Sequence, residues 1–314
     1  MPRPLCLAAI PAALLGLALT VLAVACGGDN DSLVIVVQPT NTPAELTADA
    51  GEIERFLEER LDVDVELRFP QTYAGVVESL RFGHADAAFM SAWPAALAVD
   101  EANAEVVLAE VREVTIGDEA TEAPFYYSYW VVLPDSPYTS LEELEGASVA
   151  FSSQLSTSGY VGPLARLVEL GLISPGTEDD EANADEFFDE VIFAGGYAQA
   201  WEALQAGQVD VAIIAGDVPE DLYREVLDNT RVIDEQGPLP SHAVVFAEEL
   251  EDPLRTALKN ALLELGQAEN RELMRQFISG IFVRFQETTT AEHLGALDAF
   301  LEATGLRFAE AEQP

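Results

Sequence analysis

The sequence has few positive charges. Its 314 residues include 56 Asp and Glu but only 15 Lys and Arg, and the single lysine is Lys259. The resulting net charge of −41 repels nucleic acid phosphates and anionic lipid headgroups. We therefore expect no nucleic-acid partner, and we interpret the acidic surface as an adaptation for solubility in a salty or acidic medium.

Residues and motifs that carry catalytic or metal chemistry are also scarce. The two cysteines, Cys6 and Cys26, both lie in the first 26 residues, so the rest of the chain has neither a disulfide nor a thiol nucleophile. His84, His242 and His293 are far apart, and no H-E-x-x-H, G-x-G-x-x-G or G-x-S-x-G motif occurs. We expect no metal, no cofactor and no enzyme, although a Ser-His-Asp site assembled in space stays open.

The N-terminal segment predicts export. Residues 5–25 are almost wholly apolar, and about 20 such residues can span a bilayer. The segment ends in small residues before Cys26, and a polar tether follows, a pattern similar to a bacterial lipoprotein signal. We predict a signal peptide over 1–25 and a lipidated Cys26 with its tether over 26–32. The alternatives are an ordinary cleaved signal and an uncleaved anchor, and each of them exports the domain.

The rest of the chain alternates between strand and helix patterns. Strand patterns fall at 33–37, 63–69, 85–90, 105–111, 126–133, 148–151, 191–194, 209–215 and 242–247, and helix patterns at 43–61, 71–82, 92–101, 158–171, 197–207, 251–267, 269–279 and 290–304. This alternation predicts an α/β fold with largely parallel sheets. The strands exceed one comfortable sheet, so we predict two lobes. Lobe 1 is formed by 33–130 plus 241–314, and lobe 2 by 131–240.

The stretch FSSQLSTSGYVGP, residues 151–163, holds a cluster of hydroxyl groups at a predicted helix start. A helix leaves its first N–H groups without internal partners, and one Ser or Thr is enough to cap it. Ser156, Thr157 and Ser158 supply more hydroxyls than capping needs, and Gly159 lets a ligand approach the backbone. This pattern is consistent both with plain capping and with a socket for a phosphate-like oxyanion.

Several ordered segments together resemble a known family. They include Tyr73 with the run Arg81-Phe-Gly-His-Ala-Asp86, the run Ser156-Thr-Ser-Gly-Tyr160, and Gly195-Gly-Tyr197 before a helix. In order and spacing, these segments resemble the phosphonate, phosphite and phosphate substrate-binding proteins of ABC transporters. The resemblance implies the two-lobed periplasmic-binding-protein type 2 fold, which closes by hinge motion around a ligand in an interlobe cleft.

The resemblance also implies roles for individual residues. The anion-binding hydroxyls of the family fall on Ser156, Thr157 and Ser158, with backbone help near Gly159, and its cleft tyrosine falls on Tyr73.

The chain departs from the family pattern on the other side of the cleft. Ala95 stands at an expected tyrosine, so Trp93 is the candidate to line the cleft, and Tyr197 stands where a histidine is common. Asp217 is a candidate partner for a cationic group, with helix capping as its alternative. Tyr127 completes the predicted ligand-binding set, and structural packing is the alternative for it and for both Trp93 and Tyr197.

These features predict an exported, lipid-anchored solute-binding protein that captures a small phosphorus oxyanion, either a phosphonate, phosphite or phosphate. Its expected partners are the membrane subunits of an ABC permease and, through the lipid anchor, the outer face of the cell membrane. We expect a monomer. The alternatives are the same fold with a sulfonate, nitrate-like or heterocyclic ligand, a secreted hydrolase, and a ligand-sensing module.

Overall fold

The computed structural model describes residues 32–38, 43–116, 119–177, 179–218, 220–277 and 281–307. The chain divides into two units, Met1–Asp31 and Ser32–Pro314. The predicted signal peptide, Cys26 and most of the tether therefore lie outside the described residues. Within the described ranges, no helix is both long enough and apolar enough to cross a membrane.

Seven strands form the first sheet, in the order β12-β4-β11-β3-β1-β2, with β5 paired to β4. Their bounds are β1 (Leu33–Val37), β2 (Val65–Arg68), β3 (Ala87–Met90), β4 (Glu105–Ile116), β5 (Glu119–Ala123), β11 (Ala243–Phe246) and β12 (Phe282–Glu287). Strand β1 runs parallel to β2 and β3, whereas the pairs that involve β4 and β11 are antiparallel.

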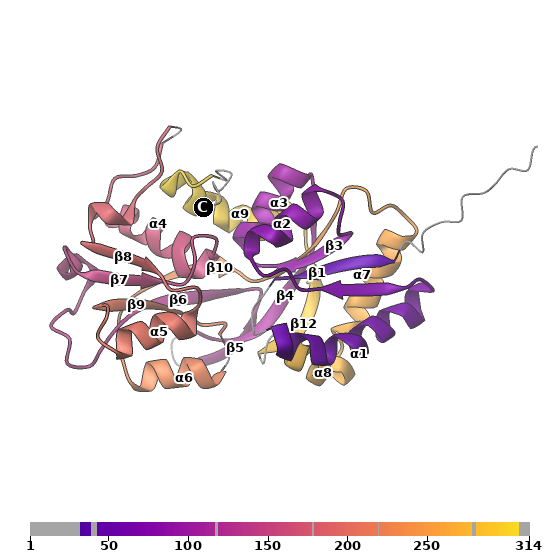
Figure 1. The fold of residues 1–314 in the computed structure, drawn as a ribbon, viewed down its shortest axis with the longest axis horizontal. Coiled ribbons are helices and arrows are strands. Elements are labelled where there is room, and N and C mark those ends of the chain that lie inside the picture. Colours follow the sequence, from indigo (N-terminus) through magenta and orange to yellow (C-terminus); the bar gives the residue numbers. More distant parts are fainter. Residues whose placement is uncertain are drawn as a thin grey trace, which may run out of the picture. The chain divides into compact units, whose positions relative to one another are not determined.

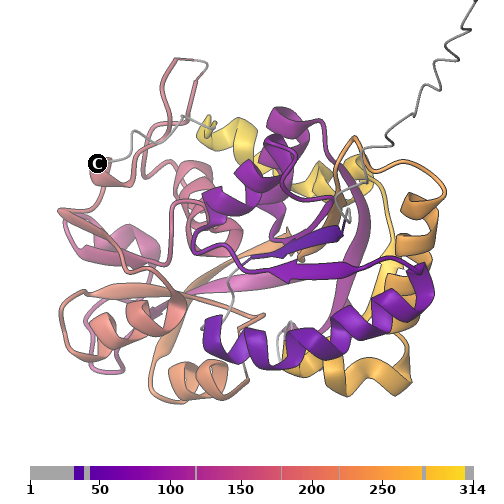
Figure 2. The same cartoon turned by 45° about the vertical axis from the view of Figure 1, so that its right-hand side comes forward.

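Helices cover both faces of the first sheet (Figure 1). The helices are α1 (Pro43–Leu61), α7 (Leu254–Leu265) and α8 (Arg271–Phe277) on one face, and α2 (Tyr73–Arg81), α3 (Ala92–Ala102) and α9 (Thr290–Thr304) on the other. Successive side chains of a strand point to opposite faces. Accordingly, Leu33 and Ile35 pack with the first group of helices, and Val34 and Val36 pack with the second. Figure 2 shows the helices on either side of the strands. Burial on both faces explains why β1 is a continuous apolar run.

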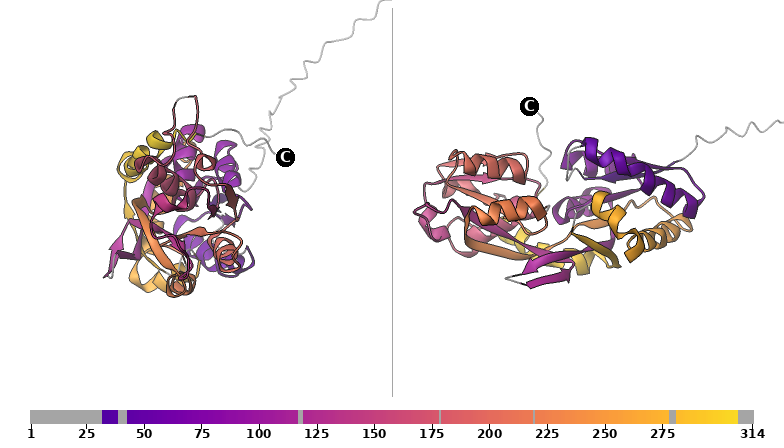
Figure 3. Two further views of the ribbon diagram at one scale, coloured as in Figure 1. Left: turned by 90° about the vertical axis from the view of Figure 1, so that its left-hand side faces the viewer. Right: turned by 90° about the horizontal axis from the view of Figure 1, so that it is seen from below.

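Five strands form the second sheet, in the order β10-β6-β9-β7-β8. Their bounds are β6 (Phe125–Val132), β7 (Ser148–Phe151), β8 (Glu190–Phe193), β9 (Val211–Ala215) and β10 (Arg231–Pro240). Helices α5 (Tyr197–Gln205) and α6 (Glu220–Asp228) cover one face, and α4 (Gly162–Glu169) packs on the other (Figure 3). Short helical turns lie at η1 (Leu141–Leu144), η2 (Thr157–Val161) and η3 (Ala184–Glu186), and a fourth, η4 (Ala268–Asn270), precedes α8.

The chain passes between the sheets twice, from β5 to β6 and from β10 to β11. The two crossings are hydrogen-bonded to each other, because the Ser241 N–H donates to the Pro124 carbonyl over 3.0 Å. The predicted lobe bounds, 33–130 plus 241–314 and 131–240, stay a prediction. Strand β6 hydrogen-bonds within the second sheet from Phe125 onward, so that sheet begins a few residues before the predicted bound.

The expectation of largely parallel sheets is wrong. Antiparallel pairs outnumber parallel ones among the described strands, because β4, β6, β10, β11 and β12 all pair antiparallel. Strand β10 was not predicted, since Gly237, Pro238 and Pro240 interrupt an acidic segment that lacks a clear period. It reaches its length through two register shifts opposite β6.

Two buried histidines, His242 in the crossing from β10 to β11 and His293 in α9, predict a pH dependence of stability. Burial lowers the pKa of His242 well below 6.5, and Arg112 and His293 lower it further. Burial also lowers the pKa of His293, although its hydrogen bond to Ser241 opposes the shift. Both are therefore neutral in the folded chain at a pH where the unfolded chain binds a proton. Their contribution to the free energy of unfolding is complete above about pH 6.5, the pKa in the unfolded chain. It is lost as the pH falls from there toward the pKa values of the folded chain.

We expect His242→Gln to reduce this loss. Between about pH 6.5 and 5, the free energy of unfolding should fall less steeply than in the wild type, by up to about 1.4 kcal/mol per pH unit. Urea unfolding at a series of pH values measures the slopes. The matched control is His84→Gln, because His84 is exposed, and its slope should follow the wild type. Equal slopes for wild type and His242→Gln contradict the account.

Candidate functional site

Ser156 caps the helical segment that begins in the hydroxyl cluster. Its Oγ accepts a hydrogen bond from the Gly159 N–H over 3.0 Å. Its carbonyl accepts from the N–H groups of both Tyr160 and Val161 over 3.1 Å, which opens the first turn, η2, into a π-helical turn. Helix α4 then continues from Gly162. Capping is thus completed by one residue, and the neighbouring hydroxyls have other contacts.

Thr157 and Ser158 direct their hydroxyls toward other elements. The Thr157 Oγ1 accepts from the backbone N–H of Trp93, at the start of α3, over 2.8 Å. The Ser158 Oγ accepts from the Tyr126 hydroxyl, in β6, over 2.9 Å. Within the described part of the chain, the backbone N–H groups of Thr157 and Ser158 make no hydrogen bond. The start of η2 therefore keeps unsatisfied donors.

Tyr197 closes the hydroxyl network. Its phenol lies 2.6 Å from the Ser158 Oγ and 3.3 Å from the Ser156 Oγ. It is the first residue of α5, and Gly195, two residues before it, adopts a φ of 91°, which favours glycine. Burial raises the pKa of Tyr197, and the Asp217 carboxylate raises it further. The phenol therefore stays protonated and neutral, and it can donate a hydrogen bond.

Gly159 allows the hydroxyls to lie close to the backbone. A Cβ at this position would lie 1.8 Å from the Ser152 Oγ and 2.9 Å from both the Ser152 Cβ and the Ser156 Oγ. No side chain fits there unless the serines move. The Ser152 Oγ is itself buried and has no hydrogen-bond partner among the described residues. Ser152 is thus a further hydroxyl at the cluster, outside the predicted ligand-binding set.

Tyr73 lies at the start of α2 in the first lobe and shares the electrostatic environment of the cluster. Burial raises its pKa, the Asp217 carboxylate raises it further, and a hydrogen bond with Gln38 opposes the shift. Tyr73 also raises the pKa of Tyr197. Tyr197 is thus in contact with the serines, and Tyr73 and Asp217 lie close enough to it to influence its pKa.

Asp217 has a partner that the sequence did not reveal. Its Oδ2 accepts from Nη1 of Arg112 over 2.5 Å, and Nη2 of the same guanidinium donates to the Glu110 Oε2 over 2.5 Å. Burial raises the pKa of Asp217, and Arg112 opposes that shift. Helix α6 begins at Glu220, three residues further on. The predicted alternative of helix capping stays a prediction, because residue 219, directly before α6, lies outside the described residues.

Two predicted aromatic residues, Tyr127 and Trp93, lie among apolar side chains, and their ligand-binding roles stay predictions. Tyr127 packs in the core beside α5 and α6, with its ring 6.5 Å from that of Phe125, and the adjacent Tyr126 reaches Ser158 instead. Adjacent residues of a strand face opposite sides, so only one of the two tyrosines can reach the cluster. Trp93 contributes its backbone N–H, while its side chain is buried in the core with α2, α3 and α9.

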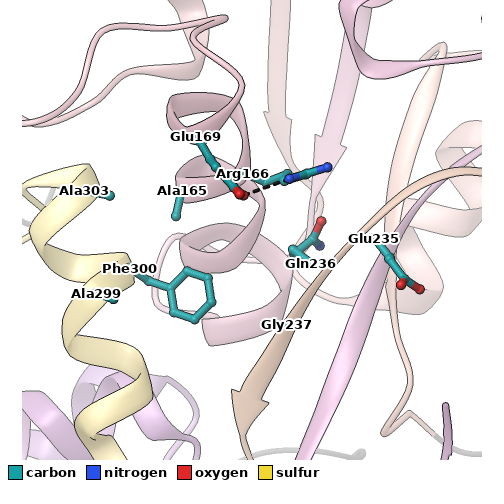
Figure 4. A pocket seen from close by; sticks show the side chains of 9 residues that line it. All are labelled: Ala165, Arg166, Glu169, Glu235, Gln236, Gly237, Ala299, Phe300 and Ala303. Carbon is teal, nitrogen blue, oxygen red and sulfur yellow. Dashed lines mark hydrogen bonds and ion pairs between the residues drawn. The ribbon is translucent and has the colours of Figure 1, made fainter.

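Two cavities lie apart from the hydroxyl network. One, of about 390 Å³, lies between α4, β10 and α9, with the Phe300 ring pointing toward α4 and Arg166 paired to Glu169 beside it (Figure 4). The other, of about 780 Å³, is lined by Trp93 together with residues of α3, α9 and the 176–177 segment. Neither is lined by Ser156, Thr157, Ser158 or Tyr197.

The chemistry of the cluster is that of neutral hydrogen-bond donors. Ser, Thr and Tyr hydroxyls each donate one hydrogen bond, and the free N–H groups of η2 add to them. Such a set suits an oxyanion that must be bound and released. Among the described residues, no group of three His, Cys, Asp or Glu side chains is arranged to hold a metal ion.

Comparison with known proteins agrees with this chemistry. The sequence model described as "ABC transporter, phosphonate, periplasmic substrate-binding protein" matches residues 35–293. The chain is 30% identical over 184 residues to the phosphate-import protein PhnD of Mycolicibacterium smegmatis, an alignment that spans 58% of this chain and 54%, about half, of that relative. It is 24% identical over 258 residues to the phosphonates-binding periplasmic protein of Escherichia coli, covering 80% of this chain and 71% of that one.

A solved structure supports the fold. The binding protein component of an ABC phosphonate transporter from Pseudomonas aeruginosa superposes with a TM-score of 0.71 at 21% identity, covering 87% of this chain and 86% of that one. The two-lobed type 2 fold expected from the sequence is thereby confirmed. With the family model matching most of its length, the chain belongs to the periplasmic substrate-binding proteins of phosphonate ABC transporters.

Proposed function

We propose that the chain is the extracytoplasmic solute-binding protein of an ABC transporter and that it binds a small phosphorus oxyanion at the start of η2. The observation that carries the proposal is the set of hydroxyl and N–H donors at Ser156, Thr157 and Ser158, which exceeds what capping uses. Its family is a class of transport proteins rather than of enzymes.

The existing hydrogen bonds leave donors for a ligand. A hydroxyl can donate one hydrogen bond and accept two. The Thr157 Oγ1 accepts from Trp93, so its own hydrogen remains free. The Ser158 Oγ accepts from Tyr126, and its hydrogen is free when the Tyr197 phenol, 2.6 Å away, donates to it as well. An oxyanion here would meet these two hydroxyls, the N–H groups of Thr157 and Ser158, and the positive end of the helix.

Neutral donors suffice for useful affinity. A hydrogen bond to a charged group contributes roughly 1.5–3 kcal/mol. Four such bonds, from the two hydroxyls and two N–H groups, contribute about 6–12 kcal/mol before the association cost, whereas micromolar binding needs about 8 kcal/mol. No lysine or arginine lies within residues 151–163, so the site relies on dipoles, and that permits release to a permease.

The names of the relatives support a phosphorus oxyanion. One imports phosphate and the other binds phosphonates. The chemical group that such ligands share is the tetrahedral oxyanion. The hydrogen-bond donors around η2 are of the kind that binds this group. The ligand would be enclosed between lobe 1, which contributes Tyr73 and the Trp93 backbone, and lobe 2, which contributes η2 and Tyr197. The permease subunits of the transporter would receive it.

Calorimetry tests the proposal. Phosphate, phosphite and methylphosphonate are titrated into the wild type and into Ser158→Ala. We expect at least one of them to bind the wild type, and the variant to bind it roughly ten- to a hundredfold more weakly, because one charge-assisted hydrogen bond is lost. The matched control is Ser153→Ala. Ser153 lies in the same loop, and among the described residues its hydroxyl accepts from the Leu155 N–H alone, so binding should be unchanged.

Two outcomes contradict the proposal. If no phosphorus oxyanion binds and a sulfonate, nitrate or heterocyclic compound does, the ligand class is wrong. If affinity is the same in Ser158→Ala and the wild type, the hydroxyl cluster is not the binding site. Thermal unfolding of each variant shows that it is folded.

We also propose that Cys26 carries the lipid that anchors the exported protein to the outer face of the membrane. Several acyl chains on one residue anchor stably, where one chain does not. Labelling of expressing cells with a fatty acid analogue should mark the wild type but not Cys26→Ser, while Cys6→Ser, within the signal, stays marked. Equal labelling of wild type and Cys26→Ser contradicts lipidation.

A further inference from the structure

A buried ion cluster lies beside the hydroxyl network. Strand β4 supplies Glu110 and Arg112, which are two residues apart and so share a face, and the turn after β9 supplies Asp217. Their side chains are 0%, 2% and 8% exposed. The cluster joins the two sheets, because Arg112 belongs to the first and Asp217 follows a strand of the second.

The Asp217 carboxylate is close enough to act on the phenols around the serines. It raises the pKa of Tyr73, Tyr126 and Tyr197, after the larger effect of burial. Two of these phenols bond to the Ser158 Oγ. A carboxylate beside an oxyanion site can serve one of two purposes. It can bind an ammonium group on the ligand, or it can pair with a cationic side chain of the protein.

The contacts favour the second use. The Arg112 guanidinium is charged at every relevant pH, and it donates directly to the Asp217 Oδ2. Arg112 cannot withdraw toward solvent, since it is buried and its Nε and Nη2 are both bonded to the Glu110 Oε2. A ligand ammonium would have to share Asp217 with this fixed positive charge, which repels it.

The pairing also suits an anion. A lone carboxylate near the phosphonate group would repel it, and the guanidinium compensates that charge from the protein side. Glu110 lies behind Arg112, and its second oxygen, Oε1, is buried without a partner in the described part of the chain. Burial raises the pKa of Glu110, and the Arg112 guanidinium opposes that shift.

We infer that the site selects phosphorus oxyanions that carry no ammonium group, with Asp217 and Arg112 as the residues that determine this specificity. The inference rests on the proposed function, because it concerns the ligand of the same site. It assigns Asp217 to the arginine rather than to a cationic substituent of the ligand.

Pairs of isosteric ligands test the inference. Ethylphosphonate and aminomethylphosphonate have nearly the same shape, as do propylphosphonate and 2-aminoethylphosphonate, and each pair differs in its ammonium group. Calorimetry on the wild type should give at least tenfold tighter binding of the ammonium-free member. Binding of phosphate or methylphosphonate with no binding of either amino compound supports the inference equally. Binding of an amino compound as tightly as its isostere overturns it.

The variant Asp217→Asn provides a second measurement. Removing a negative charge beside the anion and freeing the Arg112 charge should tighten binding of the ammonium-free oxyanion by about threefold or more. A selective loss of the amino compounds in this variant, with their isosteres still bound, overturns the inference. The matched control is Asp234→Asn, because Asp234 also pairs with an arginine, Arg166, but lies on β10 away from the serines. In Asp234→Asn, the affinities for the amino compound and for its ammonium-free isostere should both be unchanged.

The outcomes separate this inference from the proposed function. If the wild type binds no phosphorus oxyanion at all, both fail. If it binds the amino compounds as well as or better than their isosteres, only the inference on specificity fails. The wild-type comparison stands even if Asp217→Asn does not fold.

Discussion

The start of a helix leaves backbone N–H groups that something must satisfy, and at η2 the protein satisfies only part of them. Ser156 caps Gly159, and the π-helical first turn shifts the next bonds onto the Ser156 carbonyl. The N–H groups of Thr157 and Ser158 keep no partner within the described residues, although both residues are buried. A buried donor is costly unless a ligand or water pairs with it. This constraint is the reason why we propose η2 as the place where an oxyanion binds.

The two sheets meet at the same place. The Trp93 N–H of the first lobe donates to the Thr157 Oγ1 of the second, and Arg112 of the first pairs with Asp217 of the second. A ligand bound to η2 would therefore lie beside contacts that depend on the relative position of the lobes. Binding and closure are coupled wherever a ligand changes the balance of such contacts.

Local patterns were sufficient to predict much of the fold. The apolar run of β1, the Tyr73 helix and the hydroxyl-capped helix are each specified by neighbouring residues, and all three were predicted close to their observed bounds. Strand pairing could not be predicted in this way, because it depends on partners that are distant in the sequence. Strand β10 could not be predicted either, because its glycine and prolines interrupt the alternation of apolar and polar residues.

The candidate site divides in the same way. Serines at a helix start are visible in the sequence, whereas the choice of Tyr126 over Tyr127 depends on which face of β6 the sheet presents. The Arg112–Asp217 pair joins residues 105 positions apart, so no local pattern announces it.

The crystal structure of the protein with a bound phosphorus oxyanion, such as methylphosphonate, tests the central claim most directly. We expect phosphonate oxygens within hydrogen-bond distance, about 3 Å, of the Thr157 and Ser158 hydroxyls and of their backbone N–H groups. A phosphonate that lies elsewhere, for example in the cavity beside Phe300, with the serines still bonded only to Tyr126 and Tyr197, would contradict it.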